Sequence, residues 1–394
     1  MTSSIEPSFD PHASMSPAPP PEQRQLRIAF TGSGSEYFRI WIVNLLLTLV
    51  TVGLYYPWAK VRRLRYFYGN TLVDGAALDF HGNPRKMLKG TLLVALLFGL
   101  YSVAGHFSSV AGLVALVLLA AVMPELLRAS LQFRLANTSW RGLRFYFKGN
   151  TADAYRAVLP MYLPTILLFG LTALSPEVDN HKAPLWLGLS ILGLGLLTLL
   201  MFPWSFWKFK QYQHNHYALA HLQTRFNAPT SAFYKLGRNM IGWGVLAGAL
   251  IPLTVMFLFW INKPNFNGGT LQNSLMGLLP LVLMLGVFIA IKPYAIARTQ
   301  NLVWNHTGND DLQFHSNLRF KPMFGLTLKN WLLVLLTLGL YWPFAAVAMA
   351  RIRLQAASIV THIDPDTLLG QPAGNTSAAV GDAAGDMLGI DFGL

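Results

Sequence analysis

Hydrophobic residues in this chain gather in long runs that are separated by polar stretches. Eight such runs lie near residues 38–57, 88–106, 108–127, 157–175, 185–206, 240–261, 272–291 and 323–343. A helix of about 20 mostly apolar residues is long enough to cross the hydrocarbon core of a bilayer. The pattern therefore predicts a membrane protein with 6 to 8 transmembrane or re-entrant helices.

The polar stretches between these runs differ in length and in charge. Most of the 30 lysine and arginine residues lie in four longer stretches, at 58–89, 125–156, 207–239 and 292–329. The shorter connections contain only two basic residues, Lys182 and Lys263. Because lysine and arginine accumulate in cytoplasmic loops, we expect the long stretches to face the cytoplasm and the short ones to face away from it.

Five short segments alternate between apolar and polar positions, which is typical of strands. They lie at residues 26–32, 78–82, 145–149, 223–228 and 312–316. A single strand cannot satisfy its own backbone hydrogen bonds, so strands on one side of the membrane are expected to pair. The sequence predicts a small cytoplasmic sheet, antiparallel or mixed, built from short repeated strands.

The chain also resembles itself internally. The stretch that begins at Asn44 and the one that begins at Asn330 share 12 of 22 positions without a gap, in the pattern N-x-LL-x-L-x-T-x-GLY-x-P-x-A-x-V-x-x-x-R. In a looser unit, an apolar run ends at a proline and a basic, aromatic stretch follows, at Pro57, Pro124, Pro203 and Pro293. The predicted fold class is therefore a membrane all-α bundle built from internal repeats and carrying the small sheet.

The first and last apolar runs leave two topologies open. If 38–57 and 323–343 cross fully, both termini lie outside and strand 26–32 is separated from the other strands. If both runs re-enter, all five strands meet on one side, and we favour this arrangement. Six polar or glycine residues are candidate helix breaks in these two runs: Asn44, Thr51, Gly53, Asn330, Thr337 and Gly339.

Both ends of the chain differ in composition from its middle. Residues 1–25 are rich in proline and serine and have no signal-peptide pattern, and residues 361–394 are rich in glycine, alanine and aspartate. We expect both to be disordered tails around a multi-pass membrane domain at 26–360. Overall, 53% of residues are hydrophobic and 12% are charged, which argues against a soluble enzyme or a nucleic-acid-binding protein despite the net charge of +13.

The basic stretch after Pro57 carries the best candidate for binding chemistry. Aromatic rings meet cations there, in a set of six candidate contacts for an anionic lipid or ligand: Tyr55, Trp58, Lys60, Arg62, Arg63 and Arg65. Aromatic side chains gather at the headgroup level, and each nearby cation attracts anionic lipid by about 1 kcal/mol. The alternative is that these residues only anchor the topology. Membrane lipids, of anionic type, are the expected partners.

Other polar groups predict no chemistry. Glu125 is expected to pair with Arg128 at i+3, and the histidines at 214, 216 and 221 lack the acidic or cysteine ligands of a closed metal site. The glycines and serines of 32–35 lack the rest of a phosphate-binding loop. With 0 cysteines and no hydrolase signature, we expect no catalytic residue, no metal, no cofactor and no enzyme activity.

Four motifs carry a resemblance to a known family. They are FTGSGSEYFRIW at 30–41, GLYYPWAKVRRLRYFYGNT at 53–71, LDFHG at 78–82 and GLYWP at 339–343. With them the chain resembles the YjgN family over about residues 26–360. The resemblance implies a multi-pass inner-membrane protein of a Gram-negative bacterium and brings no substrate or catalytic residue. His216 and Tyr217 stand where the motif has Asn and Thr, so no role of Asn70 or Thr71 is carried over to them.

Two functions remain as hypotheses. One is transport or lipid handling, in which repeated helices enclose a path or groove, as is common among transporters. The other is a non-transporting scaffold or sensor whose cytoplasmic sheet binds a partner. A water-accessible cavity lined by Asn44, Thr51, Asn330 and Thr337 would favour the first hypothesis.

Overall fold

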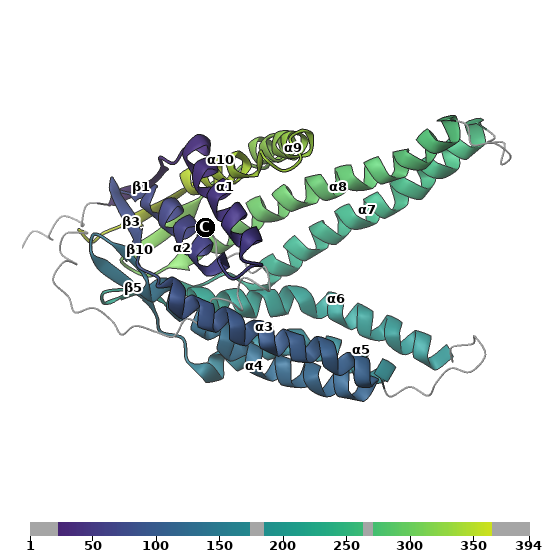
Figure 1. The fold of residues 1–394 in the computed structure, drawn as a ribbon, viewed down its shortest axis with the longest axis horizontal. Coiled ribbons are helices and arrows are strands. Elements are labelled where there is room, and N and C mark those ends of the chain that lie inside the picture. The colour runs from purple at the N-terminus through teal and green to yellow at the C-terminus, as the bar shows by residue number, and fades with distance from the viewer. Residues whose placement is uncertain (1–22, 174–184, 263–270, 365–394) are drawn as a thin grey trace, which may run out of the picture.

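One arrangement, strand–helix–helix–strand, recurs along the computed structural model, which describes residues 23–173, 185–262 and 271–364 (Figure 1). The first unit is β1 (Arg24–Phe30), α1 (Gly34–Val50), α2 (Tyr56–Gly69) and β2 (Thr71–Val73). The second unit is β3 (Ala76–Phe80), α3 (Pro84–Phe107), α4 (Ser109–Ala136) and β4 (Thr138–Trp140). The third is β5 (Leu143–Phe147), α5 (Thr151–Ala173), α6 (Leu185–His214), β6 (Tyr217–Leu219), and β7 (Leu222–Gln223) follows it. The fourth unit is β8 (Arg225–Phe226), α7 (Thr230–Asn262), α8 (Leu271–Trp304) and β9 (Thr307–Gly308). The fifth unit is β10 (Leu312–Ser316), α9 (Phe320–Leu336), α10 (Trp342–Gln355) and β11 (Ala357–Thr361).

Each pair of helices leaves the sheet and returns to it at the same place. The last residue of the strand before each hairpin pairs with the first residue of the strand after it: Phe30 with Thr71, Phe80 with Thr138, Phe147 with Tyr217, Phe226 with Thr307 and Ser316 with Ala357. An antiparallel strand pair therefore fixes the base of every helical hairpin among the described residues.

All described strands belong to one antiparallel sheet of 11 strands, in the order β7-β6-β5-β4-β3-β2-β1-β11-β10-β9-β8. The two end strands, β7 and β8, are separated in sequence by Thr224 alone, so the sheet nearly closes on itself. The predicted segments match β1, β3, β5, β7–β8 and β10, and the sheet is larger than predicted. Strands β2, β4, β6 and β9 are only two or three residues long, too short to show alternation.

Tight turns connect successive units. Asp74 and Gly75 form the two-residue loop between β2 and β3, and Arg141 and Gly142 form the loop between β4 and β5. Both residues of each loop have positive φ, from 49° to 81°. That conformation matches the twist of the paired strands and favours Asp-Gly sequences, so the dipeptide at 74–75 was a usable sequence signal for the missed strand β2.

The helical hairpins also contact one another in succession. Helix α2 contacts α3, α4 contacts α5, α6 contacts α7, α8 contacts α9, and α10 returns to α1. Aromatic rings mark two of these contacts, with centroids 5.8 Å apart for Tyr294 and Phe320 and also for Phe38 and Phe344. The hairpins thus form a ring at the end of the sheet that they share.

Within the described residues, four helices are long and apolar enough to cross a membrane, namely α3, α4, α5 and α6. This finding is consistent with a helical membrane protein, and it does not reach the predicted number of 6 to 8 spans. Figure 1 shows α3 to α8 extending to the right, away from the sheet, while α1 and α9, of 17 residues each, end much closer to it.

A proline lies in the second helix of every hairpin. In α4 and α6 the prolines Pro124 and Pro203 are inside a continuous helix, whereas Pro57 and Pro343 occupy the first turn of α2 and α10. The apolar runs at 38–57 and 323–343 are therefore divided: one helix ends at Val50 or Leu336, a turn follows, and a second helix returns to the sheet.

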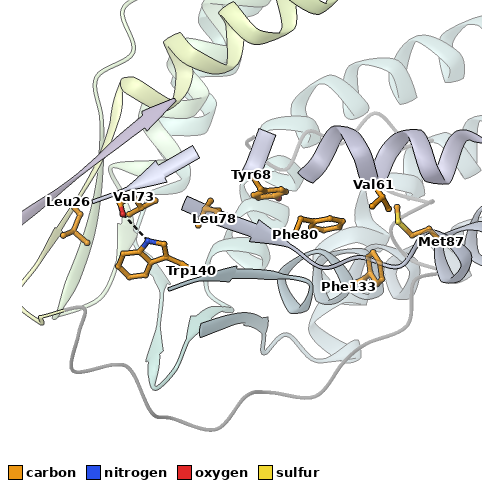
Figure 2. Close-up of a cluster of buried hydrophobic side chains, with 9 residues drawn as sticks. All are labelled: Leu26, Val61, Tyr68, Val73, Leu78, Phe80, Met87, Phe133 and Trp140. Atoms are coloured by element: carbon orange, nitrogen blue, oxygen red, sulfur yellow. Dashed lines mark hydrogen bonds between the residues drawn. The ribbon is translucent and has the colours of Figure 1, made fainter. Parts of the chain in front are cut away.

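Figure 2 shows the largest buried cluster, which joins the base of the first two hairpins to the sheet. Tyr68 of α2 stacks on Phe80 of β3 with ring centroids 5.7 Å apart. Trp140 of β4 lies beside Val73 in the same cluster, and its indole Nε1 donates a hydrogen bond to the Val73 carbonyl at 3.1 Å. The indole is buried with its single polar atom satisfied, as a stable core requires.

Most of both predicted tails, and also Lys182 and Lys263, lie outside the described residues. Strand β1 begins at Arg24 and β11 ends at Thr361, so strand pairing reaches slightly into the ranges predicted as tails. The two strands pair with each other, Arg24 opposite Thr361, which brings the first and last described strands together.

Candidate functional site

A cavity of about 440 Å³ lies within the ring of hairpins. Side chains from four of the five hairpins line it, most of them from one face each of α2, α9 and α10. On α9 the lining residues are Thr327, Asn330, Trp331 and Val334, the i, i+3, i+4, i+7 spacing of a single helix face. The cavity is thus large enough for part of a small organic molecule.

The polar lining of this cavity is cationic. Arg63 of α2, Arg134 of α4, Lys292 of α8 and Arg353 of α10 all contribute to it, and none of the described lining residues is Asp or Glu. Arg353 is held by Gln300, whose side-chain oxygen accepts from its Nε at 3.1 Å and whose amide donates to its carbonyl at 2.9 Å. Four positive charges without a lining acid favour an anionic occupant.

Asn330 adds an unsatisfied polar group to the same cavity. Its side chain is 5% exposed, and neither its amide nitrogen nor its oxygen has a hydrogen-bond partner in the protein. Leaving such a buried group unpaired costs about 1–3 kcal/mol. A ligand that carries hydrogen-bonding atoms would offset this cost, so Asn330 is an independent indication of a polar occupant.

The charged and aromatic lining residues differ in their distance from the sheet. Arg134 and Arg353 lie two residues from the sheet ends of α4 and α10. At the other end of α10, Trp342 lies 13 residues from Gln355, which is about 20 Å at the helical rise of 1.5 Å per residue. Trp331 and Val334 line the cavity near the distal end of α9. Lys292, 12 residues or about 18 Å from the sheet end of α8 at Trp304, lies about as far from the sheet as Trp342. The cavity therefore has cations at the sheet and along its length, and its tryptophans lie away from the sheet.

Arg134, at the sheet end of the cavity, lies near the Tyr217 phenol of β6. Burial raises the pKa of the Tyr217 phenol in β6, and the nearby charge of Arg134 opposes that rise only in part. The phenol therefore stays protonated at neutral pH and does not neutralise the cations above it.

The six predicted lipid-contact residues take different positions. Arg62, Arg63 and Arg65 are all exposed, and of these three only Arg63 lines the cavity. Lys60 is buried, at 3% exposure. Tyr55 and Trp58 stack on each other with centroids 6.0 Å apart, and the Arg62 guanidinium lies 5.8 Å from the Tyr55 ring.

Four of the six predicted helix breaks shape the tips of the two short hairpins. The Thr51 hydroxyl donates to the Leu47 carbonyl at 2.7 Å and accepts from the Tyr55 amide at 2.9 Å. Thr337 makes the equivalent bonds at 2.6 and 2.9 Å. Gly53 and Gly339 follow with φ of 87° and 94°, in the left-handed region that glycine adopts freely.

The two buried asparagines of these hairpins differ. The Asn44 amide donates to the Ala59 carbonyl at 3.4 Å within its own hairpin, whereas Asn330 has no such bond. Of the four polar residues expected around a cavity, only Asn330 lines this one.

The predicted histidine group divides into separate structural roles. His214 is buried against Tyr217 and Trp304, and its Nδ1 lies 3.1 Å from the Thr307 hydroxyl. His216 has a ring nitrogen 2.7 Å from the Tyr212 carbonyl, the same i−4 contact that Asn70 makes with Tyr66 at 2.8 Å. His therefore replaces Asn of the motif without loss of this helix-end hydrogen bond. In the part of the chain that the structure describes, no group of three His, Cys, Asp or Glu residues could hold a metal.

The predicted pair of Glu125 and Arg128 is confirmed. The Arg128 Nε donates to the Glu125 carboxylate at 2.9 Å, and the Thr151 hydroxyl donates to the same carboxylate oxygen at 3.0 Å. Because Thr151 begins α5, the pair joins α4 to the next helix and is occupied in packing.

Sequence reasoning missed Arg134, Lys292, Arg353 and their convergence on Arg63. Each is one of several basic residues in its own stretch, and nothing local distinguishes it from its neighbours. The usable signal was the equivalence of the units, which places the ends of different helices around one centre.

Comparisons with known proteins identify relatives of the whole chain. The model of a family described as bacterial protein of unknown function, DUF898, matches residues 25–387. The inner membrane protein YjgN of Salmonella typhimurium is 25% identical over 353 residues, covering 86% of this chain and 89% of that protein. YjgN of Escherichia coli K12 is 28% identical over 148 residues, or 36% of this chain and 35% of that protein. No solved structure matches the chain.

The resemblance read from the four motifs is thus supported over nearly the full length, by a family model and by relatives named as inner membrane proteins. The chain belongs to the YjgN family, the DUF898 proteins of bacteria.

Proposed function

We propose that this protein is a multi-pass inner-membrane protein that handles lipid, by holding an anionic lipid of the cytoplasmic leaflet in its central cavity. The observation that carries the proposal is the cavity itself, with Arg63, Lys292 and the unpaired Asn330 among its lining residues. A phosphate headgroup would supply both the negative charge and the hydrogen-bond acceptors that suit these side chains.

The membrane placement rests on the hairpins. In this proposal the three long hairpins, α3–α4, α5–α6 and α7–α8, cross the bilayer, and the sheet lies in the cytoplasm. The basic residues lie toward the sheet, and positive charge on the cytoplasmic side is the usual arrangement in inner-membrane proteins. The names of the relatives support the same location.

The direction of the cavity favours a lipid over a small soluble anion. Arg134 and Arg353 lie at its sheet end, and its large apolar side chains, Trp331 and Trp342, lie toward the bilayer. A lipid of the cytoplasmic leaflet has this orientation, with the headgroup toward the cytoplasm and the acyl chains toward the midplane. A soluble anion would leave the apolar half of the cavity without a partner.

Lipid binding by cavity variants tests the proposal. The double variant Arg63→Gln, Lys292→Gln removes two lining charges, and at about 1 kcal/mol each the affinity for phosphatidylglycerol should fall about 30-fold. The measurement is a titration of purified protein with phosphatidylglycerol or phosphatidylethanolamine, followed by native mass spectrometry. Wild-type protein should prefer the anionic lipid.

A matched control variant also removes two positive charges, both from the first hairpin and both outside the cavity. Arg39 and Arg62 are exposed and do not line the cavity, so Arg39→Gln, Arg62→Gln should change lipid binding by less than a factor of about 3. Equal losses in the two double variants, or equal binding of the two lipids by wild-type protein, would contradict the cavity as the binding site.

A further inference from the structure

The first and last hairpins carry exposed apolar tips. Val50 and Val52, at the α1–α2 tip, are 81% and 92% exposed, and Leu336 and Leu338, at the α9–α10 tip, are 77% and 94% exposed. Their neighbours Leu49, Leu54, Leu335 and Leu340 are also exposed. Contiguous apolar patches of this kind mark an interaction with a membrane or with another protein.

Charges on the same hairpins limit how far these tips can reach. Arg62 is exposed and lies six residues after Tyr56, about 9 Å along α2 from its start. Lys329 is exposed and lies seven residues before Leu336, about 10 Å from the end of α9. If these cations stay at the headgroup level, the tips enter about half of a hydrocarbon core that is about 30 Å thick.

The long hairpins have no such limit. In α3 the last charged residue before Phe107 is Lys89, 18 residues or about 27 Å away. In α6 no charged residue lies between Leu185 and Lys208, a stretch of about 34 Å. These lengths match the whole hydrocarbon core, whereas the apolar parts of the short hairpins match one leaflet.

The position of the prolines supports the same division. The helix from the proline to the sheet has nearly equal length in both classes, since Pro57 to Gly69 and Pro124 to Ala136 are each 12 residues apart. Before the proline, α4 continues for 15 residues from Ser109, whereas α2 begins one residue earlier, at Tyr56. The short hairpins therefore keep the half next to the sheet and lack the distal half.

We propose that α1–α2 and α9–α10 are re-entrant hairpins whose apolar tips insert into the cytoplasmic leaflet and end near the bilayer midplane. The occupant of these exposed tips is the acyl-chain region of that leaflet. This inference rests on the membrane placement proposed above and does not depend on the cavity ligand.

Single cysteines test the proposal directly, because the natural chain contains none. The variants Val52→Cys and Leu338→Cys change exposed tip residues, and Phe107→Cys, 82% exposed at the tip of α3–α4, is the matched control on a long hairpin. A membrane-impermeant maleimide is applied to intact spheroplasts and, separately, to inside-out vesicles.

The Phe107→Cys variant should react from the periplasmic side only, whereas Val52→Cys and Leu338→Cys should react from neither side and become reactive once detergent and denaturant are added. In proteoliposomes, a spin label at position 52 or 338 should be more accessible to oxygen than to a polar nickel reagent, as expected near the midplane. Reaction of either tip from the periplasm would mean full crossing, and reaction from the cytoplasm would mean a tip in water; each result overturns the proposal. Failure of the Phe107→Cys control alone would instead contradict the membrane placement.

Discussion

The short terminal hairpins and the long central hairpins share one base and differ only in their distal halves. Both classes begin and end at a paired strand position, and both contain the proline and the helix that follows it. The short class replaces the distal half by a turn built from a threonine and a glycine with positive φ. The base of each unit thus serves the fold, while the distal half determines how much of a bilayer the unit could cross.

The difference also explains where the cavity lies. Its walls come mainly from α2, α9 and α10, which belong to the short hairpins, and the long hairpins contribute chiefly Arg134, Lys292 and Ile296. A ring of five equal long hairpins would bury this region under helices. Two short members leave room above the cavity, on the side where lipid would be present in the proposed placement.

A lysine introduced at the hairpin tip should give the largest difference in stability between the short and the long class. Val52→Lys places a cation near the midplane if the hairpin is re-entrant, at a cost of about 3 kcal/mol. Phe107→Lys places the same charge at the far surface of the membrane, at a cost below about 1 kcal/mol. The measurement is the yield of monodisperse protein together with its thermal midpoint in detergent-free nanodiscs. Similar losses in both variants would remove the distinction between the classes.

The tip glycines should have the next largest effect. Gly339→Ala introduces a side chain at φ of 94°, with no atom within 4 Å, so the cost is conformational and about 1–2 kcal/mol. Gly99→Ala, inside helix α3 and also without a close neighbour, should instead be neutral or stabilising by up to about 1 kcal/mol. The thermal midpoints of the two variants should therefore move in opposite directions, and a shared direction would contradict the role of Gly339 in the turn.

Asn330 should give the smallest change in stability and a clear change in binding. Asn330→Leu removes the unpaired amide from lipid-free protein, and the thermal midpoint should rise by an amount that corresponds to about 1 kcal/mol. Phosphatidylglycerol binding should weaken in the same variant. The control Asn44→Leu changes a buried asparagine that does not line the cavity, so it should leave lipid binding unchanged. If lipid-free Asn330→Leu protein has a lower thermal midpoint than lipid-free wild type, the unpaired Asn330 amide is not destabilising and this explanation is excluded.

Local pattern predicted the elements of this fold better than their assembly. Three kinds of pattern served the prediction: the long apolar runs, the five alternating segments, and the match between the stretches at Asn44 and Asn330. Each is read from residues that are close together within one stretch of sequence. The strands β2, β4, β6 and β9 were missed because they have two or three residues each, too few to show alternation. The division of the run at 38–57 into two helices depends on the left-handed turn at Gly53, which a hydropathy pattern does not register.

The candidate site was predicted only in part for the same reason. Arg63 and Asn330 were named as candidates, but the first was grouped with its sequence neighbours and the second with the tip residues. Arg134, Lys292 and Arg353 reach the cavity from three other helices, which local reasoning cannot bring together. Lys60 is 3% exposed although the basic residues that follow it are exposed, and sequence pattern alone does not register this difference.

The pairing of β1 with β11 has a consequence for biosynthesis. The ribosome makes Arg24 before its partner Thr361, and all five hairpins lie between them, so one edge of the first strand stays open while these units emerge. Exposed strand edges invite association with other chains. The protein closes this edge by joining the first described strand to the last, so the sheet is complete only after all five hairpins have been made.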